Sequence, residues 1–190
     1  MSTRIVAAAV ALAAALALTG CQGTTSAAPT PVQSSDLTSS DGGFDQNAVV
    51  GVVLLRSAAT PGTTSGGVPL ATRFRDDLTA AGFRPDVRVA GTADAAADQE
   101  RAVRQLVQRG AKALLVEAAD PASLSGALQV AHDAGVVVVA VGDPLPTSGT
   151  GGDGVSADYR VQGSDSDAAT VAKATAVVES LQRGEKPRNG

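Results

Sequence analysis

Apolar and polar residues alternate in blocks along residues 48–190, and these blocks predict strands and helices in turn. Short, largely apolar runs predict five strands, at residues 49–55, 86–90, 113–116, 136–141 and 155–157. Apolar residues three or four positions apart predict four helices, at residues 68–81, 95–109, 121–134 and 165–183. Strands that alternate with helices are typical of a parallel sheet covered on both faces. We therefore expect an α/β fold, a three-layer sandwich with a mostly parallel sheet.

The first residues carry a different pattern, which predicts a signal for export. Arg4 precedes an apolar run over residues 5–18, which is too short for a membrane-spanning helix of about 20 residues. The run ends in Leu-Thr-Gly-Cys at residues 18–21, which resembles the lipobox of bacterial lipoproteins. We expect a signal peptide at residues 1–20 and lipidation of Cys21, which would hold the exported protein on the extracytoplasmic side of the cell membrane. An ordinary signal peptide followed by a chance cysteine is the alternative.

The composition changes at about residue 48, and this change divides the exported chain. Residues 21–47 are mainly Thr, Ser, Ala, Pro, Gly and Asp, which offer almost nothing to bury. Such a segment is typical of a flexible linker. We expect a lipid-anchored stalk at residues 21–47 and an α/β solute-binding-like lobe at residues 48–190.

Charge and cysteine content exclude several classes of partner. The formal net charge is −4 at pH 7 and the arginines are scattered, so no basic stripe predicts nucleic-acid binding. The single cysteine excludes a disulfide framework and a thiolate metal site. Aromatic residues are 2% of the chain and Trp is absent, so the core must consist of Val, Leu and Ala.

No catalytic motif stands out in the sequence. The loop at residues 60–67 matches neither a P-loop nor the Gly-x-Gly-x-x-Gly fingerprint, and no Gly-x-Ser-x-Gly elbow presents a nucleophile. The only histidine, His132, lies beside Asp133 on what we predict to be a solvent-exposed helix face. We therefore expect a protein that is not an enzyme and that uses no cofactor, metal or catalytic residue.

The candidate ligand contacts are polar residues in loops that we place after strands. In parallel sheets, ligands approach the carboxyl ends of the strands. Carboxylates, hydroxyls and guanidinium groups there suit ligands rich in hydroxyl groups. Helix capping and loop solvation are the alternative, and capping accounts for Asp120. The candidates are Ser57, Asp120, Asp143, Asp158 and Arg160, with Thr60 and Glu117 in similar loops.

Several segments together resemble type I periplasmic sugar-binding proteins, in particular the xylose and multiple-monosaccharide branch. The resemblance lies in residues 99–112, in 116–128 with 131–141, and in Val-Ser-Ala-Asp at 155–158 followed by Gly163. It implies the substrate-binding component of a sugar-type ABC importer, with a small-molecule solute as ligand and an ABC permease as partner.

The chain departs from that family in its length and in its expected sugar contacts. Family members have two lobes, and we expect the N-terminal lobe only, with a second lobe as a further partner and truncation of a longer protein as one explanation. No aromatic lies between residues 48 and 73 to stack on a sugar. Asp143 follows Gly142 where the family has Asp-Arg, so the arginine is missing. The alternative function is a surface-tethered interaction or sensor module that keeps the lobe without sugar binding.

Overall fold

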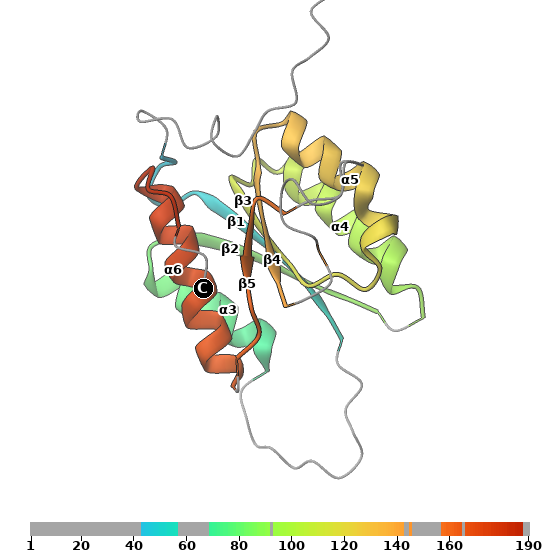
Figure 1. Ribbon diagram of the computed structural model, residues 1–190, viewed down its shortest axis with the longest axis horizontal. Helices are drawn as coiled ribbons and strands as arrows, with labels where there is room; N and C mark the ends of the chain where they lie inside the picture. Colours follow the sequence, from blue (N-terminus) through green and yellow to red (C-terminus); the bar gives the residue numbers. More distant parts are fainter. Residues whose placement is uncertain are drawn as a thin grey trace, which may run out of the picture. The chain divides into compact units, whose positions relative to one another are not determined.

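A parallel sheet forms the centre of the lobe in the computed structural model, which describes residues 43–56, 69–91, 93–142, 145, 157–164 and 166–187. The five strands follow the order β2-β1-β3-β4-β5, and every neighbouring pair is parallel (Figure 1). Their bounds are Val49–Leu55 (β1), Arg84–Ala90 (β2), Ala113–Val116 (β3), Val137–Val141 (β4) and Tyr159–Val161 (β5).

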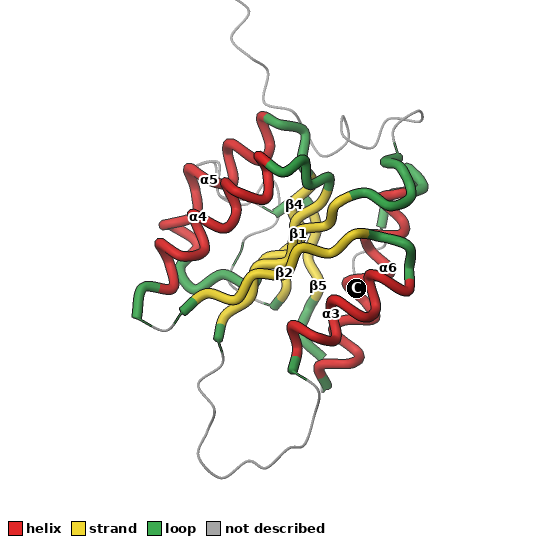
Figure 2. Tube along the Cα trace, turned by 180° about the vertical axis from the view of Figure 1, so that it is seen from behind, coloured by secondary structure: helices red, strands yellow, loops and turns green. Residues whose placement is uncertain are grey.

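Two helices cover each face of the sheet, which confirms the three-layer α/β fold (Figures 1 and 2). One face carries α3 and α6, and the other carries α4 and α5. The helices span Leu70–Ala80 (α3), Ala95–Gln108 (α4), Pro121–Asp133 (α5) and Asp167–Gln182 (α6). Within the described ranges, no helix combines the length and the apolar composition needed to cross a bilayer.

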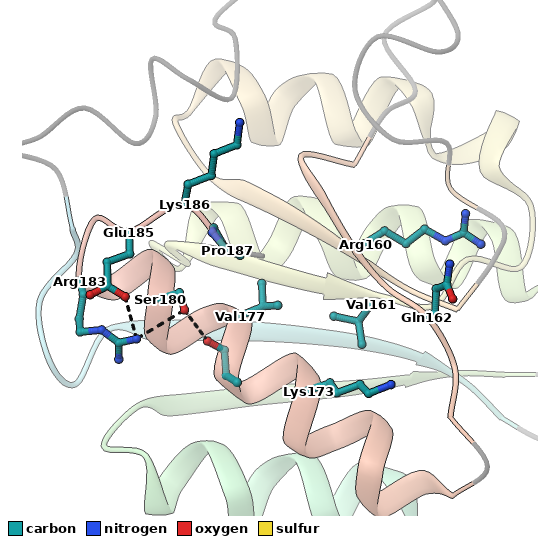
Figure 3. A pocket seen from close by; sticks show the side chains of 11 residues that line it. Arg160, Val161, Gln162, Lys173, Val177, Ser180, Arg183, Glu185, Lys186 and Pro187 are labelled. Atoms are coloured by element: carbon teal, nitrogen blue, oxygen red, sulfur yellow. Dashed lines mark hydrogen bonds and ion pairs between the residues drawn. The ribbon is translucent and has the colours of Figure 1, made fainter. Parts of the chain in front are cut away.

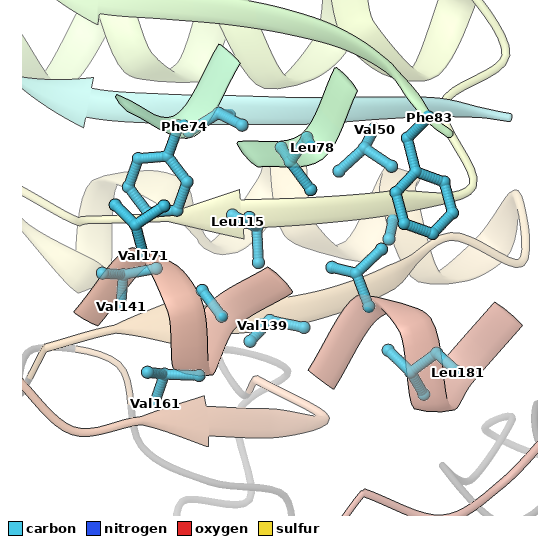
Figure 4. Close-up of a cluster of buried hydrophobic side chains, with 14 of the residues drawn as sticks. Val50, Phe74, Leu78, Phe83, Leu115, Val139, Val141, Val161, Val171 and Leu181 are labelled. Carbon is cyan, nitrogen blue, oxygen red and sulfur yellow. The ribbon is translucent and has the colours of Figure 1, made fainter. Parts of the chain in front are cut away.

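Side-chain alternation along the central strands builds two separate cores. In β3, Leu115 points into the core beneath α3 and α6, while Leu114 and Val116 point into the core beneath α4 and α5. Phe74 of α3 and Val171 of α6 contribute to the first of these cores (Figure 4). A strand that buries both faces must be apolar throughout, which is why these strands appear as continuous apolar runs in the sequence.

The fifth strand lies four residues beyond its predicted position. The sequence predicts it at 155–157, but β5 spans Tyr159–Val161, and residues 155 and 156 lie outside the described part of the chain. Tyr159 and Val161 are buried, while Arg160 between them is partly exposed. This alternation of buried and exposed positions is the pattern of a strand with one face in the core. The charged residue at its centre hides the strand from a search for apolar runs.

Candidate functional site

The carboxyl ends of the strands meet along one side of the sheet, which we call the carboxyl edge. It is formed by the residues that follow four strands: Arg56 after β1, Gly91 after β2, Glu117 after β3 and Gly142 after β4. Ligands of parallel sheets bind at such an edge, because the loops that leave the strands cluster there. This edge is therefore the place to test the candidate residues.

Glu117 joins the ends of two central strands. Its Oε2 accepts a hydrogen bond from the Leu55 backbone N–H at 3.0 Å, and its own N–H donates to the Val53 carbonyl at 2.9 Å. The side chain is partly buried. The carboxylate thus holds β1 against β3 and fixes the position from which both loops leave the sheet.

Gln99 holds the loop between β3 and α5 in place through two hydrogen bonds. The residue lies on α4 and is completely buried. Its Nε2 donates to the Glu117 carbonyl, and its Oε1 accepts from the Ala119 N–H at 2.8 Å. A buried amide whose donor and acceptor are both used holds a loop more rigidly than apolar contact does. Sequence analysis missed this role, although a glutamine on the core-facing side of a helix was the available signal.

Asp98 connects the start of α4 to the end of β2. Its Oδ2 accepts from the Gly91 N–H at 3.1 Å, and its Oδ1 accepts from Nη1 of Arg101 at 2.9 Å. The Gly91 hydrogen bond, followed by the bond from Arg101, lowers the pKa of the Asp98 carboxyl below its ordinary value of 3.8. Sequence analysis missed this contact as well.

Asp120 lies at the carboxyl edge and caps α5, as its place before Pro121 predicts. One carboxylate oxygen accepts from the Ala122 N–H at 3.0 Å, while the residue is exposed to solvent. Within the described ranges its second oxygen has no hydrogen-bond partner. Capping and ligand contact are therefore compatible here, because each uses a different oxygen.

Arg160 reaches the same edge from the middle of β5. Its Nε donates to the Gly142 carbonyl, directly after β4, at 3.0 Å. The guanidinium is thereby held near the point where β4 ends, and it is partly exposed. A planar donor in this position can serve a ligand oxygen while it stays bonded to the backbone.

The predicted position of Asp158 at the carboxyl edge is wrong. Because β5 begins at Tyr159, Asp158 precedes the strand and lies at the opposite, amino edge. Its Oδ2 accepts from the Val138 N–H at 2.7 Å, and its side chain is 6% exposed. The structure therefore does not bring Asp158 together with Asp120 and Arg160.

The predicted exposure of His132 is also wrong. Its Nε2 lies 3.3 Å from Oδ2 of Asp158, and its side chain is only 16% exposed. The approach satisfies the distance of an ion pair but lacks hydrogen-bond geometry. His132 therefore belongs to the contact between α5 and the start of β5, away from the candidate ligand contacts.

Four remaining candidates, Ser57, Thr60, Asp143 and Cys21, lie outside the described residues. Among the residues that are described, no group of three or more His, Cys, Asp or Glu side chains could hold a metal ion. Of the candidate contacts, Asp120 and Arg160 are the ones that the structure describes at the carboxyl edge, where Glu117, Gln99 and Asp98 hold the backbone by hydrogen bonds.

Comparison with known protein families identifies the family to which this chain belongs. A family model described as a periplasmic binding protein domain matches residues 66–184, which is more than half of the chain. The chain belongs to the periplasmic binding protein family. The match covers β2 to α6 and therefore includes most of the sheet that forms the carboxyl edge.

Solved structures of solute-binding proteins are also similar to this periplasmic binding protein domain. A carbohydrate transporter solute-binding protein from Chloroflexus aurantiacus, in complex with D-glucose, is 24% identical with a TM-score of 0.46, over 62% of this chain and 31% of that one. An ABC transporter solute-binding protein from Mycobacterium smegmatis, with bound glycerol, is 21% identical with a TM-score of 0.45, over 60% and 35%. The chain thus spans about a third of the length of these proteins. No curated protein matches the sequence.

Proposed function

We propose that this chain is the lipid-anchored substrate-binding component of a sugar-type ABC importer, with residues 48–190 forming one side of the ligand cleft. The observation that carries the proposal is membership of the periplasmic binding protein family over residues 66–184. The segments at 116–128 and 131–141, which resemble the sugar-binding branch, support an importer of this class.

Asp120 and Arg160 are the described side chains that we assign to ligand contact. A sugar hydroxyl both donates and accepts hydrogen bonds, so it can donate to the Asp120 carboxylate and accept from the Arg160 guanidinium. Ser57 and Asp143 join them as contacts proposed from sequence alone. Glu117 and Gln99 are positioning residues, because their side chains are hydrogen-bonded to the backbone of the loops that carry the site.

The partners follow from the same proposal. A second lobe would form the other side of the cleft, and an ABC permease would receive the solute. Cys21 would carry the lipid that keeps the lobe close to that permease on the extracytoplasmic side of the membrane. We infer that residues 21–47 act as the stalk between the lipid and the lobe, since their composition offers almost nothing to bury.

Thermal unfolding of the full chain in the presence of single monosaccharides tests ligand binding. A sugar at 100 times its dissociation constant is expected to raise the free energy of unfolding by about 2.7 kcal/mol. The Asp120→Asn variant should keep the α5 cap, because asparagine caps helices as well as aspartate does. It should nevertheless lose most of the sugar-dependent stabilisation, because the carboxylate is gone.

Asp133→Asn is the matched control, because Asp133 lies at the other end of the same helix and is exposed. This variant should respond to sugar as the unmodified chain does. If no monosaccharide at millimolar concentration stabilises the chain, sugar reception by this lobe on its own is refuted. The alternative function, a surface-tethered interaction or sensor module that keeps the lobe without sugar binding, would then be favoured.

A further inference from the structure

A groove runs between β5 and α6; its lining includes Arg160, which is also a proposed sugar contact, but not Asp120. We call it the β5–α6 groove; its volume is about 640 Å³ (Figure 3). Its walls come from β5, from the outer side of α6 and from the residues that follow α6. Because β5 is last in the strand order, the groove lies along the edge of the sheet that β5 forms.

The centre of the groove is apolar. Val161 of β5 and Pro187 after α6 are buried, and Val177 of α6 is partly buried. Figure 3 shows Val161 and Val177 lying between the charged side chains at the two ends of the groove. Apolar side chains in a concave surface favour a partner that brings apolar groups of its own.

The ends of the groove are cationic. Four lining residues carry a positive charge and one carries a negative charge: Arg160, Lys173, Arg183 and Lys186 against Glu185. Glu185 is paired with Arg183 at 3.0 Å. Within the described ranges no carboxylate lies at ion-pair distance from Lys173 or Lys186. Lys173 and Lys186 therefore give the groove positive charge, although the whole chain has a formal net charge of −4.

The dimensions fit a short extended segment. Lys173 lies on α6, and Arg183 caps the end of this helix, shortly before Lys186. The ten residues from Lys173 to Arg183 correspond to about 15 Å at 1.5 Å per helical residue. An extended chain advances about 3.3 Å per residue, so about five residues span this length. If two copies met groove to groove, each would bring the same positive charge, so charge opposes that mode of self-association.

We propose that the β5–α6 groove binds an extended acidic segment of another protein. Apolar side chains of that segment lie against Ala176, which is exposed, and Val177, which is partly buried. Its acidic side chains pair with Lys173 at one end and Lys186 at the other. The groove shares Arg160 with the proposed sugar contacts. The two lysines are not among those contacts, so changing them tests the groove separately.

Selection from a phage-displayed library of random seven-residue peptides tests the proposal on the full chain. The double variant Lys173→Glu/Lys186→Glu serves for counter-selection. Peptides that are enriched on the unmodified chain alone should carry acidic residues on both sides of an apolar one. By fluorescence polarisation, the double variant should bind the enriched peptide at least about tenfold more weakly, because two attractive pairs become repulsive.

Lys112→Glu is the matched control, because Lys112 is an exposed lysine ahead of β3 that does not line the groove. It should leave peptide affinity unchanged, and circular dichroism should show that all variants fold. The proposal is overturned by enriched peptides without acidic residues, by a failure to enrich any peptide, or by equal binding to the double variant. It is also overturned if the lysines instead bind phosphatidylglycerol vesicles, or if they drive dimer formation, without binding the peptide.

Discussion

The side chain of Asp158 accepts a hydrogen bond from the backbone N–H of Val138 near the start of β4. Its nearly buried carboxylate accepts from the Val138 N–H at 2.7 Å and lies 3.3 Å from Nε2 of His132. One side chain thus ties the first residues of β4 to the end of α5 and to the start of β5. A buried amide N–H that loses its partner is costly, so this contact stabilises the amino edge of the sheet.

Asp158→Ala is expected to lower the free energy of unfolding by about 1–3 kcal/mol, because the Val138 N–H would stay buried without an acceptor. Asp158→Asn should cost less, since its amide oxygen can still accept. Urea unfolding measures both values. Asp133→Ala is the control, because Asp133 is exposed and its bond to Gln129 is local. Equal stability of Asp158→Ala and the unmodified chain would show that the contact contributes nothing.

Local sequence could not have shown the partner of His132. The residue stands next to an exposed aspartate on a helix face that the pattern predicts to be polar. Its actual partner, Asp158, follows 26 residues later in the sequence and reaches it only because β5 pairs with β4. Residue-scale contacts across the sheet are set by the fold, so they become predictable only once strand positions are known.

At the scale of whole elements, Asp98 joins α4 to β2, and its lowered pKa makes that junction sensitive to pH. The hydrogen bond from Gly91 favours the ionised carboxylate in the folded state. The folded pKa is therefore below the ordinary value of 3.8. The stabilisation is complete above that ordinary value and is lost as the pH falls through the folded pKa.

Asp98→Asn should therefore lose less stability than the unmodified chain when the pH falls below 3.8. Arg101→Gln should keep most of the pH dependence, because the bond from Gly91 is the larger cause and remains. Urea unfolding at a series of acidic pH values measures both. A flat profile for Arg101→Gln would instead assign the effect to the arginine.

Gly51 allows α4 to approach β1 closely. A Cβ atom at this position would lie 2.5 Å from Cδ2 of Leu114 and 2.8 Å from Cδ1 of Leu106. Both leucines are completely buried, so they have little room to move. Gly51→Ala is therefore expected to destabilise the lobe by about 1–3 kcal/mol through overpacking.

Gly163→Ala is the control for this prediction, because nothing lies within 4 Å of the Cβ it would add. Thermal and urea unfolding of the two variants should differ, with the Gly163 variant close to the unmodified chain. If both alanine variants are equally stable, close packing at Gly51 does not limit the approach of α4.

The sequence predicted most elements of the lobe, and the reason lies in how each is buried. The strands β1, β3 and β4 lie inside the sheet and bury both faces, so their residues are apolar throughout. The outer strand β5 buries only alternate residues over three positions, which is too short a pattern to recognise. The position of Asp120 was predictable because this residue caps a helix. The bonds of Gln99 to the Glu117 carbonyl and the Ala119 N–H were not, because they join α4 to a loop 18 to 20 residues away in the sequence.

At the scale of the whole molecule, the lipid anchor that we propose at Cys21 would decide where the lobe works. Cys21 is the only cysteine, so any thiol-linked lipid must be attached there. A diacylglyceryl group supplies two acyl chains, and stable membrane anchoring requires two such signals, since each buried methylene contributes only about 0.8 kcal/mol. If the lipobox at residues 18–21 is processed, the mature protein begins at an acylated Cys21.

Intact-mass spectrometry of the protein from a bacterial membrane fraction distinguishes the two explanations of the amino terminus. Lipidation predicts a chain that begins at residue 21 and carries the mass of a diacylglyceryl group. It also predicts that the Cys21→Ser variant is neither lipidated nor cleaved before residue 21. An ordinary signal peptide predicts an unmodified mature chain for both. Unmodified protein in the soluble extracytoplasmic fraction would therefore overturn the anchor and leave the lobe free to diffuse, whereas an acylated Cys21 would restrict its partners to those at the membrane surface.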